Sequence, residues 1–345
     1  MKTRRVDDLI RIAAAGGGFS MDASTGHTDD LIRIAAAASG KGLIIFRGMN
    51  SRSTDDLILQ AAQHRNVVRI FGTGEWDGES IYIAMEYLPK GSLEDEAKGA
   101  YVDLTRARRL MIDVLRGLEH LHGNGILHRD LKPGNVLIDN GNNAQISDFG
   151  LAVPADADFS ESPLAQYNYV LHRDPRVIAG KDYDVQSDIY AAGVTFYRLA
   201  NGDQYLGNID GQDLDEDILA GVFPDRTKYR PFVPRQLRTV INRAMQPKAS
   251  KRYRSATDFR RAIEAIPIQM NWKERLRLDG IEWRGTSAGR FATVRLQRGS
   301  VVVRKGASKD TLRRCNALCV DSEPHQAEKH ARRILQDFVL GRLKP

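Results

Sequence analysis

The sequence predicts an α+β protein in which a mostly helical segment lies between two regions of mixed helix and strand. Three observations support this prediction. Helical and strand-like stretches alternate near the N-terminus, two apolar runs precede a helix-rich middle, and strands followed by one helical stretch are expected near the C-terminus. The 345 residues suit two or three domains, and 42% hydrophobic against 28% charged residues are enough for a packed core.

The first region repeats a short helical motif. DDLIRIAAA occurs at 7–15 and again at 29–37, and a degenerate copy, DDLILQAAQ, occupies 55–63. Thr28 and Thr54 stand at the N-cap positions of two copies, and the paired Asp residues that follow suit the positive end of a helix dipole. Repeats at this spacing are typical of stacked supersecondary units.

Strands are expected between these helices. Phe19–Ala23 and Leu43–Gly48 are short apolar runs flanked by glycine-containing breaks. We therefore expect residues 1–53 to form βα repeats with a structural role, and they are candidates to contribute to a small N-terminal lobe.

Positive charge gathers at the other end of the chain. The formal net charge is +7, and residues 271–345 alone hold 17 Lys and Arg against 8 Asp and Glu. The rest of the protein is therefore close to neutral, which argues against a protein that coats nucleic acid. An acidic partner for the basic tail is one interpretation and a solvated basic face is the other. Nucleic acid is disfavoured because no series of aromatic residues accompanies the charge.

Cysteine usage and hydropathy indicate where the protein works. Cys315 and Cys319 are the two cysteines of the chain, and without a second pair they complete neither a metal site nor a disulfide framework. No apolar run approaches the roughly 18 to 20 residues of a membrane-spanning helix, and Asp7 and Asp8 interrupt any signal-peptide core. We therefore expect a cytoplasmic protein with no membrane partner.

The candidate catalytic and metal-binding residues lie in the middle region. The octapeptide HRDLKPGN contains Asp130, Lys132 and Asn135, and a predicted strand separates it from SDFG, which contains Asp148. Phosphoryl transfer requires positioned oxygen atoms and neutralised charge more than covalent help from the protein. A loop Asp can orient a hydroxyl group, a Lys two residues later can reach a γ-phosphate, and Asn and Asp oxygens are hard ligands for Mg²⁺. We assign catalysis to Asp130 and Lys132, and metal binding to Asn135 and Asp148.

At these residues the chain resembles a eukaryotic-type protein kinase domain. The Lys in Asp130-Leu131-Lys132 is similar to that of the serine/threonine class. The resemblance covers residues 54–266 and implies a bilobal fold, ATP and Mg²⁺ as cofactors and a protein substrate. Residues 267–345 then form a basic α+β extension.

The resemblance also implies the residues around ATP. Met85 matches the gatekeeper position, Glu86 and Leu88 belong to the hinge whose backbone holds adenine, and Leu137 matches the apolar floor beneath it. Lys132, Asn135 and Asp148 would bind the nucleotide at its phosphates. The residues that match the four stacked apolar positions between the lobes are Leu59, Ile70, His128 and Phe149.

Two further matches concern the helical lobe. Asp188, in SDIYAAG, matches the residue of the central helix that braces the catalytic loop. The family's Ala-Pro-Glu motif at the end of the activation segment here reads Asp174-Pro175-Arg176. Arg176 cannot form the family's ion pair with Arg252, and Asp174 is the candidate replacement.

The phosphate loop and the strand Lys of the family are missing from their usual place. Arg47 stands at a strand position in the first region, whereas the tail offers SAGRFATV followed by a turn and a strand that ends in Lys305. In one arrangement the tail folds back, completes the small lobe and brings Lys305 to the phosphates. In the other, it is an independent module of β-hairpin and helix with a basic face.

The sequence thus predicts an ATP- and Mg²⁺-dependent protein serine/threonine kinase. The alternative is a pseudokinase that acts as a nucleotide-responsive binding or scaffold module. The intact Asp130, Lys132, Asn135 and Asp148 favour the enzyme, and the missing phosphate loop and strand Lys favour the alternative.

Overall fold

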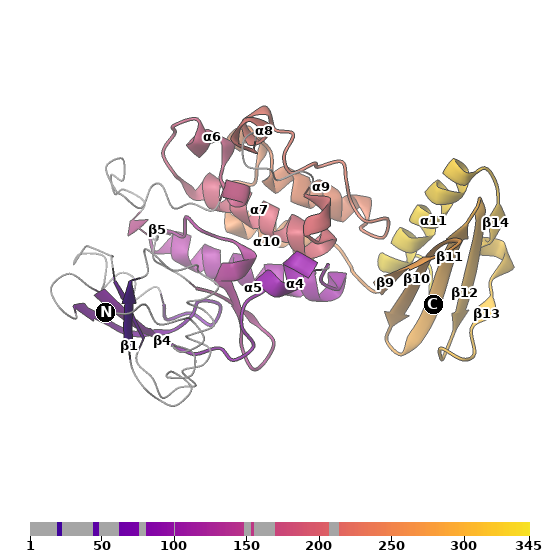
Figure 1. Cartoon of the computed structure of the whole chain (residues 1–345), viewed down its shortest axis with the longest axis horizontal. Helices are drawn as coiled ribbons and strands as arrows, with labels where there is room; N and C mark the ends of the chain where they lie inside the picture. The colour runs from indigo at the N-terminus through magenta and orange to yellow at the C-terminus, as the bar shows by residue number, and fades with distance from the viewer. Residues whose placement is uncertain are drawn as a thin grey trace.

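The α+β class is confirmed by the computed structural model, in which helices occur beside small, mostly antiparallel sheets. The structure describes residues 19–22, 44–47, 62–75, 81–99, 101–147, 153–154, 170–206 and 214–345. Figure 1 shows three parts in series, with short strands at one end, a group of helices in the middle and a sheet with one long helix at the other end. Within the described residues, no helix combines the length and the apolar character needed to cross a bilayer.

The N-terminal part contains a parallel and an antiparallel strand pair. β1 (Phe19–Asp22) and β2 (Ile44–Arg47) pair in parallel, and both lie inside the apolar runs expected to be strands. β3 (Ile70–Glu75) and β4 (Ile81–Met85) form an antiparallel hairpin, and β2 lies against β4. The helical repeats expected around β1 and β2 lie outside the described residues, apart from the last two residues of the third copy.

The helical lobe is built around two buried helices, α5 (Leu104–Gly123) and α7 (Val185–Asn201). In α5, apolar residues recur every three or four positions, and this stripe is buried against the lobe. Gly193 in α7 allows close helix packing, since a Cβ there would lie 2.8 Å from the Cβ of Ala244. The shorter helices of this lobe are α4 (Glu94–Gly99), α6 (Pro175–Ile178), α8 (Leu214–Ala220), α9 (Arg235–Ala244) and α10 (Ala256–Glu264).

Short strand pairs frame the loop that carries the HRDLKPGN motif. The loop runs from β5 (Ile126–Leu127) to β6 (Val136–Ile138). β5 pairs with β8 (Val153–Pro154), and β6 pairs with β7 (Ala144–Ile146). The motif is therefore fixed at both ends by backbone hydrogen bonds. Single turns of 3-10 helix lie at Pro133–Asn135, Val170–His172, Asp203–Tyr205, Ala249–Lys251 and Asn316–Leu318.

The C-terminal part is a six-stranded antiparallel sheet with one covering helix, which we call the C-terminal module. The helix α11 (Pro324–Val339) packs against one face of the sheet, where Trp272, Trp283, Val294 and Val303 are buried. Every second residue of the strands points to this core, as the period of two requires. The strands are β9 (Asn271–Arg277), β10 (Gly280–Ser287), β11 (Arg290–Gln297), β12 (Ser300–Gly306), β13 (Arg313–Arg314) and β14 (Val320–Asp321).

The loop-like SAGR segment of the tail is a hairpin turn. Ser287 pairs with Arg290 across β10 and β11, so only Ala288 and Gly289 form the connection. Both have positive φ, 45° and 77°, which is typical of the tight turns that join antiparallel strands. The composition that resembles a phosphate loop is thus explained by the demands of a two-residue turn.

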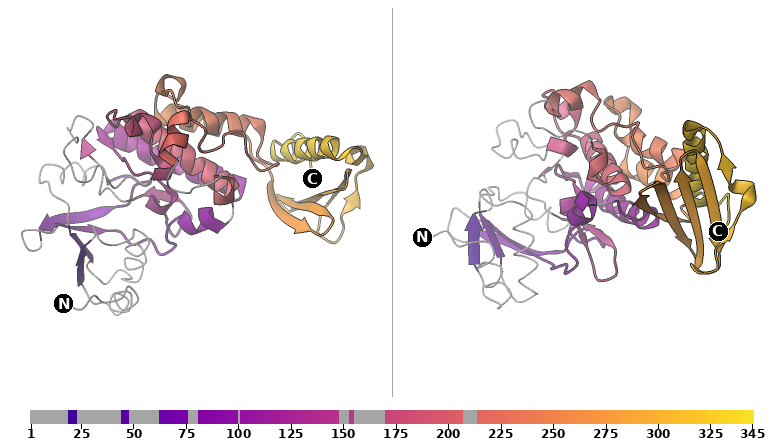
Figure 2. Two further views of the ribbon diagram at one scale, coloured as in Figure 1. Left: turned by 45° about the horizontal axis from the view of Figure 1, so that its top comes forward. Right: turned by 45° about the vertical axis from the view of Figure 1, so that its right-hand side comes forward.

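The module lies on the far side of the helical lobe from β3 and β4, as Figure 2 shows from two directions. Its sheet and α11 enclose Trp272, Trp283, Val294 and Val303 between them, and the module is not placed beside β3 and β4. The hydrophobic cluster continues from the helical lobe into the module, and polar contacts add to it. The Tyr101 hydroxyl donates to the Trp272 carbonyl at 2.8 Å, and Gln336 donates to the Pro231 carbonyl at 3.0 Å.

Candidate active site

One buried carboxylate holds the loop between β5 and β6. Oδ2 of Asp188 accepts the backbone N–H of His128 at 2.9 Å, and Oδ1 accepts that of Arg129 at 2.9 Å. Arg129 has a φ of 70°, a left-handed conformation that is uncommon for residues other than glycine. The two hydrogen bonds therefore stabilise a strained turn, and this is the brace that the sequence predicts for Asp188. His122 Nε2 and the Tyr183 hydroxyl contact the same carboxylate at 2.8 and 3.1 Å.

The environment of Asp188 keeps it ionised. Burial alone would raise the pKa of this carboxyl group, but the hydrogen bond and charge of His122 and the amide of His128 lower the pKa below its ordinary value. A charged carboxylate is the stronger acceptor for the backbone amides of the loop between β5 and β6. The negative charge of Asp188 therefore strengthens the two hydrogen bonds that fix the loop.

Three predicted site residues meet on this loop. Lys132 Nζ lies 2.8 Å from Oδ2 of Asp130. The Asn135 side chain donates to the same oxygen at 2.9 Å and to the Asp130 carbonyl at 2.8 Å. Within the described part of the chain no hydrogen bond reaches Oδ1 of Asp130. The carboxylate is therefore oriented through one oxygen, while the other can accept a substrate hydroxyl.

Asn135 also fits the role of a magnesium ligand. Its side chain is fully buried, and Oδ1 has no hydrogen-bond partner within the described residues. A buried amide oxygen without a partner is costly, and a hard cation such as Mg²⁺ would satisfy it. Among the described residues, no group of three or more His, Cys, Asp and Glu side chains could hold a metal.

The second predicted metal ligand, Asp148, lies outside the described residues. The residue before it is described, and the Ser147 N–H donates to the Asn135 carbonyl at 2.9 Å. The residue directly before Asp148 is thus hydrogen-bonded to Asn135, the other predicted metal ligand.

The predicted adenine site is assembled around the hinge. Met85 ends β4 opposite Ile70 and packs against the core, and the Glu86 N–H donates to the Arg69 carbonyl at 2.8 Å. Leu88, three residues after Met85, is 5% exposed. The backbone after β4 is therefore held by a hydrogen bond to the residue that precedes β3.

β6 lies next to the segment that follows the hinge. Leu137 forms an isolated β-bridge with Ser92, and the Ile138 N–H donates to the Gly91 carbonyl at 2.9 Å. The Leu93 N–H reaches the carbonyls of Pro133 and Val136 at 3.1 and 3.0 Å. These bonds bring the predicted floor residue and the catalytic loop to one end of the hinge.

The remaining predicted positions are placed in part. Ile70 and His128, from the four stacked positions, are both buried, whereas Leu59 and Phe149 lie outside the described residues. Arg47 ends β2, a strand that lies against β4.

Among the predicted site residues that the structure describes, Lys305 is the one that lies away from both the hinge and the loop between β5 and β6. It lies on β12 of the C-terminal module, and its ammonium donates to the Lys344 carbonyl at 2.8 Å. Because the module is closed by its own helix and lies beyond the helical lobe (Figure 1), the structure does not bring Lys305 to the catalytic loop.

Sequence reasoning missed two partners of the loop, His122 and Tyr183. A single His near the end of a helix and a single Tyr in a loop carry no pattern, so only their position beside Asp188 reveals their role. His172 was missed as well. It is buried, and burial together with the charges of Arg198 and Lys132 holds its pKa well below the ordinary 6.5.

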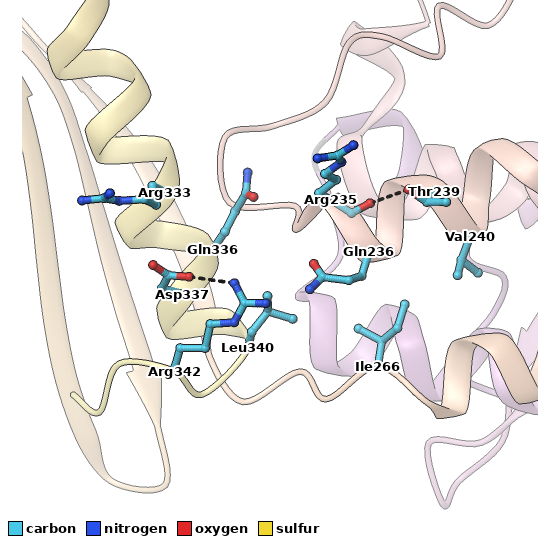
Figure 3. Close-up of a pocket in the computed structure, with 10 residues that line it drawn as sticks. All are labelled: Arg235, Gln236, Thr239, Val240, Ile266, Arg333, Gln336, Asp337, Leu340 and Arg342. Carbon is cyan, nitrogen blue, oxygen red and sulfur yellow. Dashed lines mark hydrogen bonds and ion pairs between the residues drawn. The ribbon is translucent and has the colours of Figure 1, made fainter.

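A cavity of about 660 Å³ lies apart from these residues, between α9 and α11 (Figure 3). Polar side chains such as Arg235 and Gln336 line it together with Val240, Ile266 and Leu340. None of the predicted site residues lines this cavity.

The braced loop, the ion pair of Asp130 with Lys132 and the buried Asn135 give this α+β framework a cluster of the residue types that phosphoryl transfer requires. Comparison with known proteins gives the family. Residues 51–262 match the protein kinase domain, and the chain belongs to this family.

Three of the relatives are named protein kinases. The chain is 35% identical over 187 residues to an Arabidopsis thaliana protein named SNF1-related protein kinase catalytic subunit alpha KIN12, covering 52% of this chain and 37% of that protein. It is 31% identical over 201 residues to a calcium/calmodulin-dependent protein kinase type 1 of Macrobrachium nipponense, covering 57% of each chain. It is 30% identical over 207 residues to the serine/threonine-protein kinase PrkC of Bacillus subtilis, covering 58% of this chain and 31% of PrkC. The chain thus spans between about a third and just over half of the length of these relatives.

Proposed function

We propose that the protein transfers the γ-phosphate of ATP to serine or threonine hydroxyl groups of a protein substrate. The observation that carries this proposal is the convergence of Lys132 and Asn135 on one oxygen of the Asp130 carboxylate. Such an arrangement orients an acceptor hydroxyl beside a fixed positive charge. The name of the Bacillus subtilis relative, a serine/threonine-protein kinase, supports serine and threonine as acceptors.

In the proposed reaction the substrate hydroxyl donates a hydrogen bond to Oδ1 of Asp130. Its oxygen forms a bond to the γ-phosphorus as the bond from that phosphorus to the ADP oxygen breaks, and the hydroxyl proton passes to Asp130. Lys132 offsets the negative charge of the moving phosphoryl group. Bound Mg²⁺ supplies further positive charge at the phosphates, and Asn135 and Asp148 are the residues that would hold it.

Adenine is expected to contact the hinge. The backbone of Glu86 and Leu88 would meet its polar edge, while Met85 and Leu137 offer apolar surface on either side. For the phosphates, Arg47 remains a candidate cation from the N-terminal region, because β2 lies against β4.

The test is phosphoryl transfer from labelled ATP to a mixture of generic protein substrates, with and without Mg²⁺. Asp130→Asn and Asp148→Ala should each lower the transfer rate at least about 100-fold, since each removes a group that acts in the transition state. The matched control is Asp225→Asn, which changes an Asp on the surface of the helical lobe and should leave the rate unchanged. Transfer that survives both active-site changes would contradict the assignment.

The same experiment separates the enzyme from a pseudokinase. A pseudokinase would bind Mg·ATP, detected by a shift of thermal unfolding, and transfer no label. Arg47→Ala adds a test of the N-terminal region. A loss of ATP affinity would support Arg47 as the phosphate contact, and unchanged affinity would exclude it.

A further inference from the structure

The open face of the C-terminal sheet carries a row of cations. The strand register places Lys273, Arg284, Thr293, Arg304 and Arg314 directly beside one another on β9 to β13. Cross-strand neighbours project from the same face, and here it is the face opposite α11. The four cations are exposed, and strand spacings of about 4.8 Å make the row about 19 Å wide.

Most of this charge has no internal partner. Lys273, Arg304 and Arg314 form no ion pair or side-chain hydrogen bond within the residues that the structure describes, and Arg284 pairs with Glu282. The register sets Lys273 directly opposite Arg284, and Arg304 directly opposite Arg314. Like charges in directly opposite positions repel each other and destabilise a sheet. An external anion bound between them would reduce this repulsion.

Apolar side chains stand at the edge of the same sheet. Leu276 and Leu278, at the tip of the β9–β10 hairpin, are 80% and 112% exposed. They are the most exposed of the large apolar side chains that the structure describes. By the same alternation, Arg275 and Arg277 project from the cationic face and Leu276 projects from the face of α11, while Leu278 lies in the turn between β9 and β10. The tip therefore combines two unburied leucines with adjacent positive charge.

We propose that this cationic face, together with the tip of the β9–β10 hairpin, docks onto the surface of an anionic lipid bilayer. The cations contact acidic headgroups, and the leucines enter the boundary between headgroups and acyl chains. This is association with a membrane surface and does not require a spanning helix, so it revises the expectation of no membrane partner drawn from hydropathy alone.

Nucleic acid fits the face less well. The aromatic side chain on this face is Phe291, and Lys309 lies over its ring, 5.8 Å from the ring centre. Binding of single strands normally adds stacking on several exposed rings to the electrostatic attraction. The two leucines, in contrast, have no function in a contact with a phosphate backbone.

The experiment is co-sedimentation of the full chain with phosphatidylcholine vesicles, with or without about one third phosphatidylserine. Binding is expected only with phosphatidylserine, and it should weaken as salt is added. Replacing Lys273, Arg304 and Arg314 with Gln should lower the partition coefficient about 100-fold. Leu276→Ser with Leu278→Ser should lower it about tenfold.

Each variant has a matched control in the helical lobe. Arg235, Arg254 and Arg261 are three exposed cations whose replacement by Gln changes the net charge equally. Leu219 and Val222 are exposed apolar residues for the serine control. Both control variants should bind vesicles as the wild type does, and fluorescence of the buried Trp272 and Trp283 reports folding in every case.

Two results would overturn the proposal. One is a wild-type chain that stays in solution with phosphatidylserine vesicles at low salt. The other is tighter binding to a single-stranded DNA oligonucleotide than to these vesicles, which would assign the cationic row to nucleic acid. Neither result depends on phosphoryl transfer, so the proposal is independent of the kinase activity.

Discussion

Arg252 and Asp174 form a bidentate ion pair inside the helical lobe. Nη1 of Arg252 lies 2.7 Å from Oδ2 of Asp174, and Nη2 lies 2.8 Å from Oδ1, with both side chains buried. The pair joins the end of the activation segment to the loop before α10. The acid therefore stands two positions earlier than in the family pattern, and Arg176 instead contacts Asp174 and Asp184.

Asp174→Asn tests whether this pair anchors the segment. Asn keeps an oxygen for the N-cap of α6 but leaves the buried Arg252 without a counter-ion. We expect the free energy of unfolding to fall by about 3 to 5 kcal/mol, measured by urea denaturation. Arg176→Gln is the control, because its guanidinium is partly exposed and its loss should cost at most about 1 kcal/mol. Equal losses in the two variants would show that Arg252 is not the anchoring partner.

The stability contributed by Asp174 also depends on pH. Burial raises the pKa of its carboxyl group, but the hydrogen bond and charge of Arg252 outweigh burial and lower the pKa below 3.8. A carboxyl group with a depressed pKa stabilises the fold above its ordinary pKa, and this contribution is lost as the pH falls through the folded value. Below about pH 4 the difference in stability between wild type and Asp174→Asn should therefore shrink. A difference that stays constant down to pH 3 would contradict the depressed pKa.

Asp188→Asn should uncouple the catalytic loop from α7. An amide has one acceptor oxygen, so one of the two backbone N–H groups of His128 and Arg129 loses its partner inside the lobe. We expect the correctly aligned loop to lose about 1 to 3 kcal/mol of stabilisation. The phosphoryl-transfer rate should therefore fall about 10- to 100-fold. The KM for ATP should change less, since the hinge is not touched. A raised KM with an unchanged kcat would contradict a positioning role for Asp188.

Three of the predicted site residues lie together in the structure because they are close in the chain. Asp130, Lys132 and Asn135 lie within six residues, so a single loop conformation brings them together. The contacts to Asp188 from His122 and Tyr183 could not be predicted in this way. They depend on how α5 and the loop before α7 pack against each other, which no local pattern determines.

The tail shows the limits of reading motifs by composition. Its turns at Ala288-Gly289 and Arg298-Gly299 have positive φ, so hairpin geometry alone accounts for the glycine at the second position of each turn. The same composition resembled a phosphate loop, and the cationic strand end then made Lys305 a candidate ligand. What distinguishes the hairpin from a phosphate loop is the set of buried side chains, including Trp272 and Trp283, that pack beneath α11. This packing covers the sheet without any contribution from the small lobe.

His172 should make stability depend on pH near neutrality. Its depressed pKa means that the unfolded chain binds a proton below pH 6.5 while the folded chain does not. Stability therefore rises with pH up to about 6.5, and on acidification it falls by about 1.4 kcal/mol per pH unit from this group. Urea denaturation of wild type and His172→Gln between pH 7 and pH 5 measures the effect. The variant should lose less stability over this range, and parallel pH profiles would exclude His172 as the source.

The contact between the helical lobe and the C-terminal module centres on Arg230. Its Nη1 lies 3.1 Å from Oε1 of Glu274 on β9, and its Nε donates to the Asn201 carbonyl at 2.7 Å. The guanidinium lies 4.2 Å from the ring centre of Tyr101. Oε2 of Glu274 accepts the indole N–H of Trp283 at 2.8 Å, so the ion pair is linked to the core of the module.

Breaking this pair should release the module from the lobe without unfolding either one. Arg230→Ala leaves Glu274 without its counter-ion. Glu274→Ala leaves the guanidinium of Arg230, which is 4% exposed, without a carboxylate partner. Each change should weaken the docking of the module by about 3 kcal/mol. The double variant should lose much less than the sum, because the second change removes a charge that is already unpaired. Limited proteolysis between α10 and β9 reports release, and Arg342→Ala, which breaks an exposed pair with Asp337 inside the module, should leave this segment resistant. Strictly additive losses, or a segment that stays resistant in both single variants, would mean that the apolar contacts alone hold the two parts together.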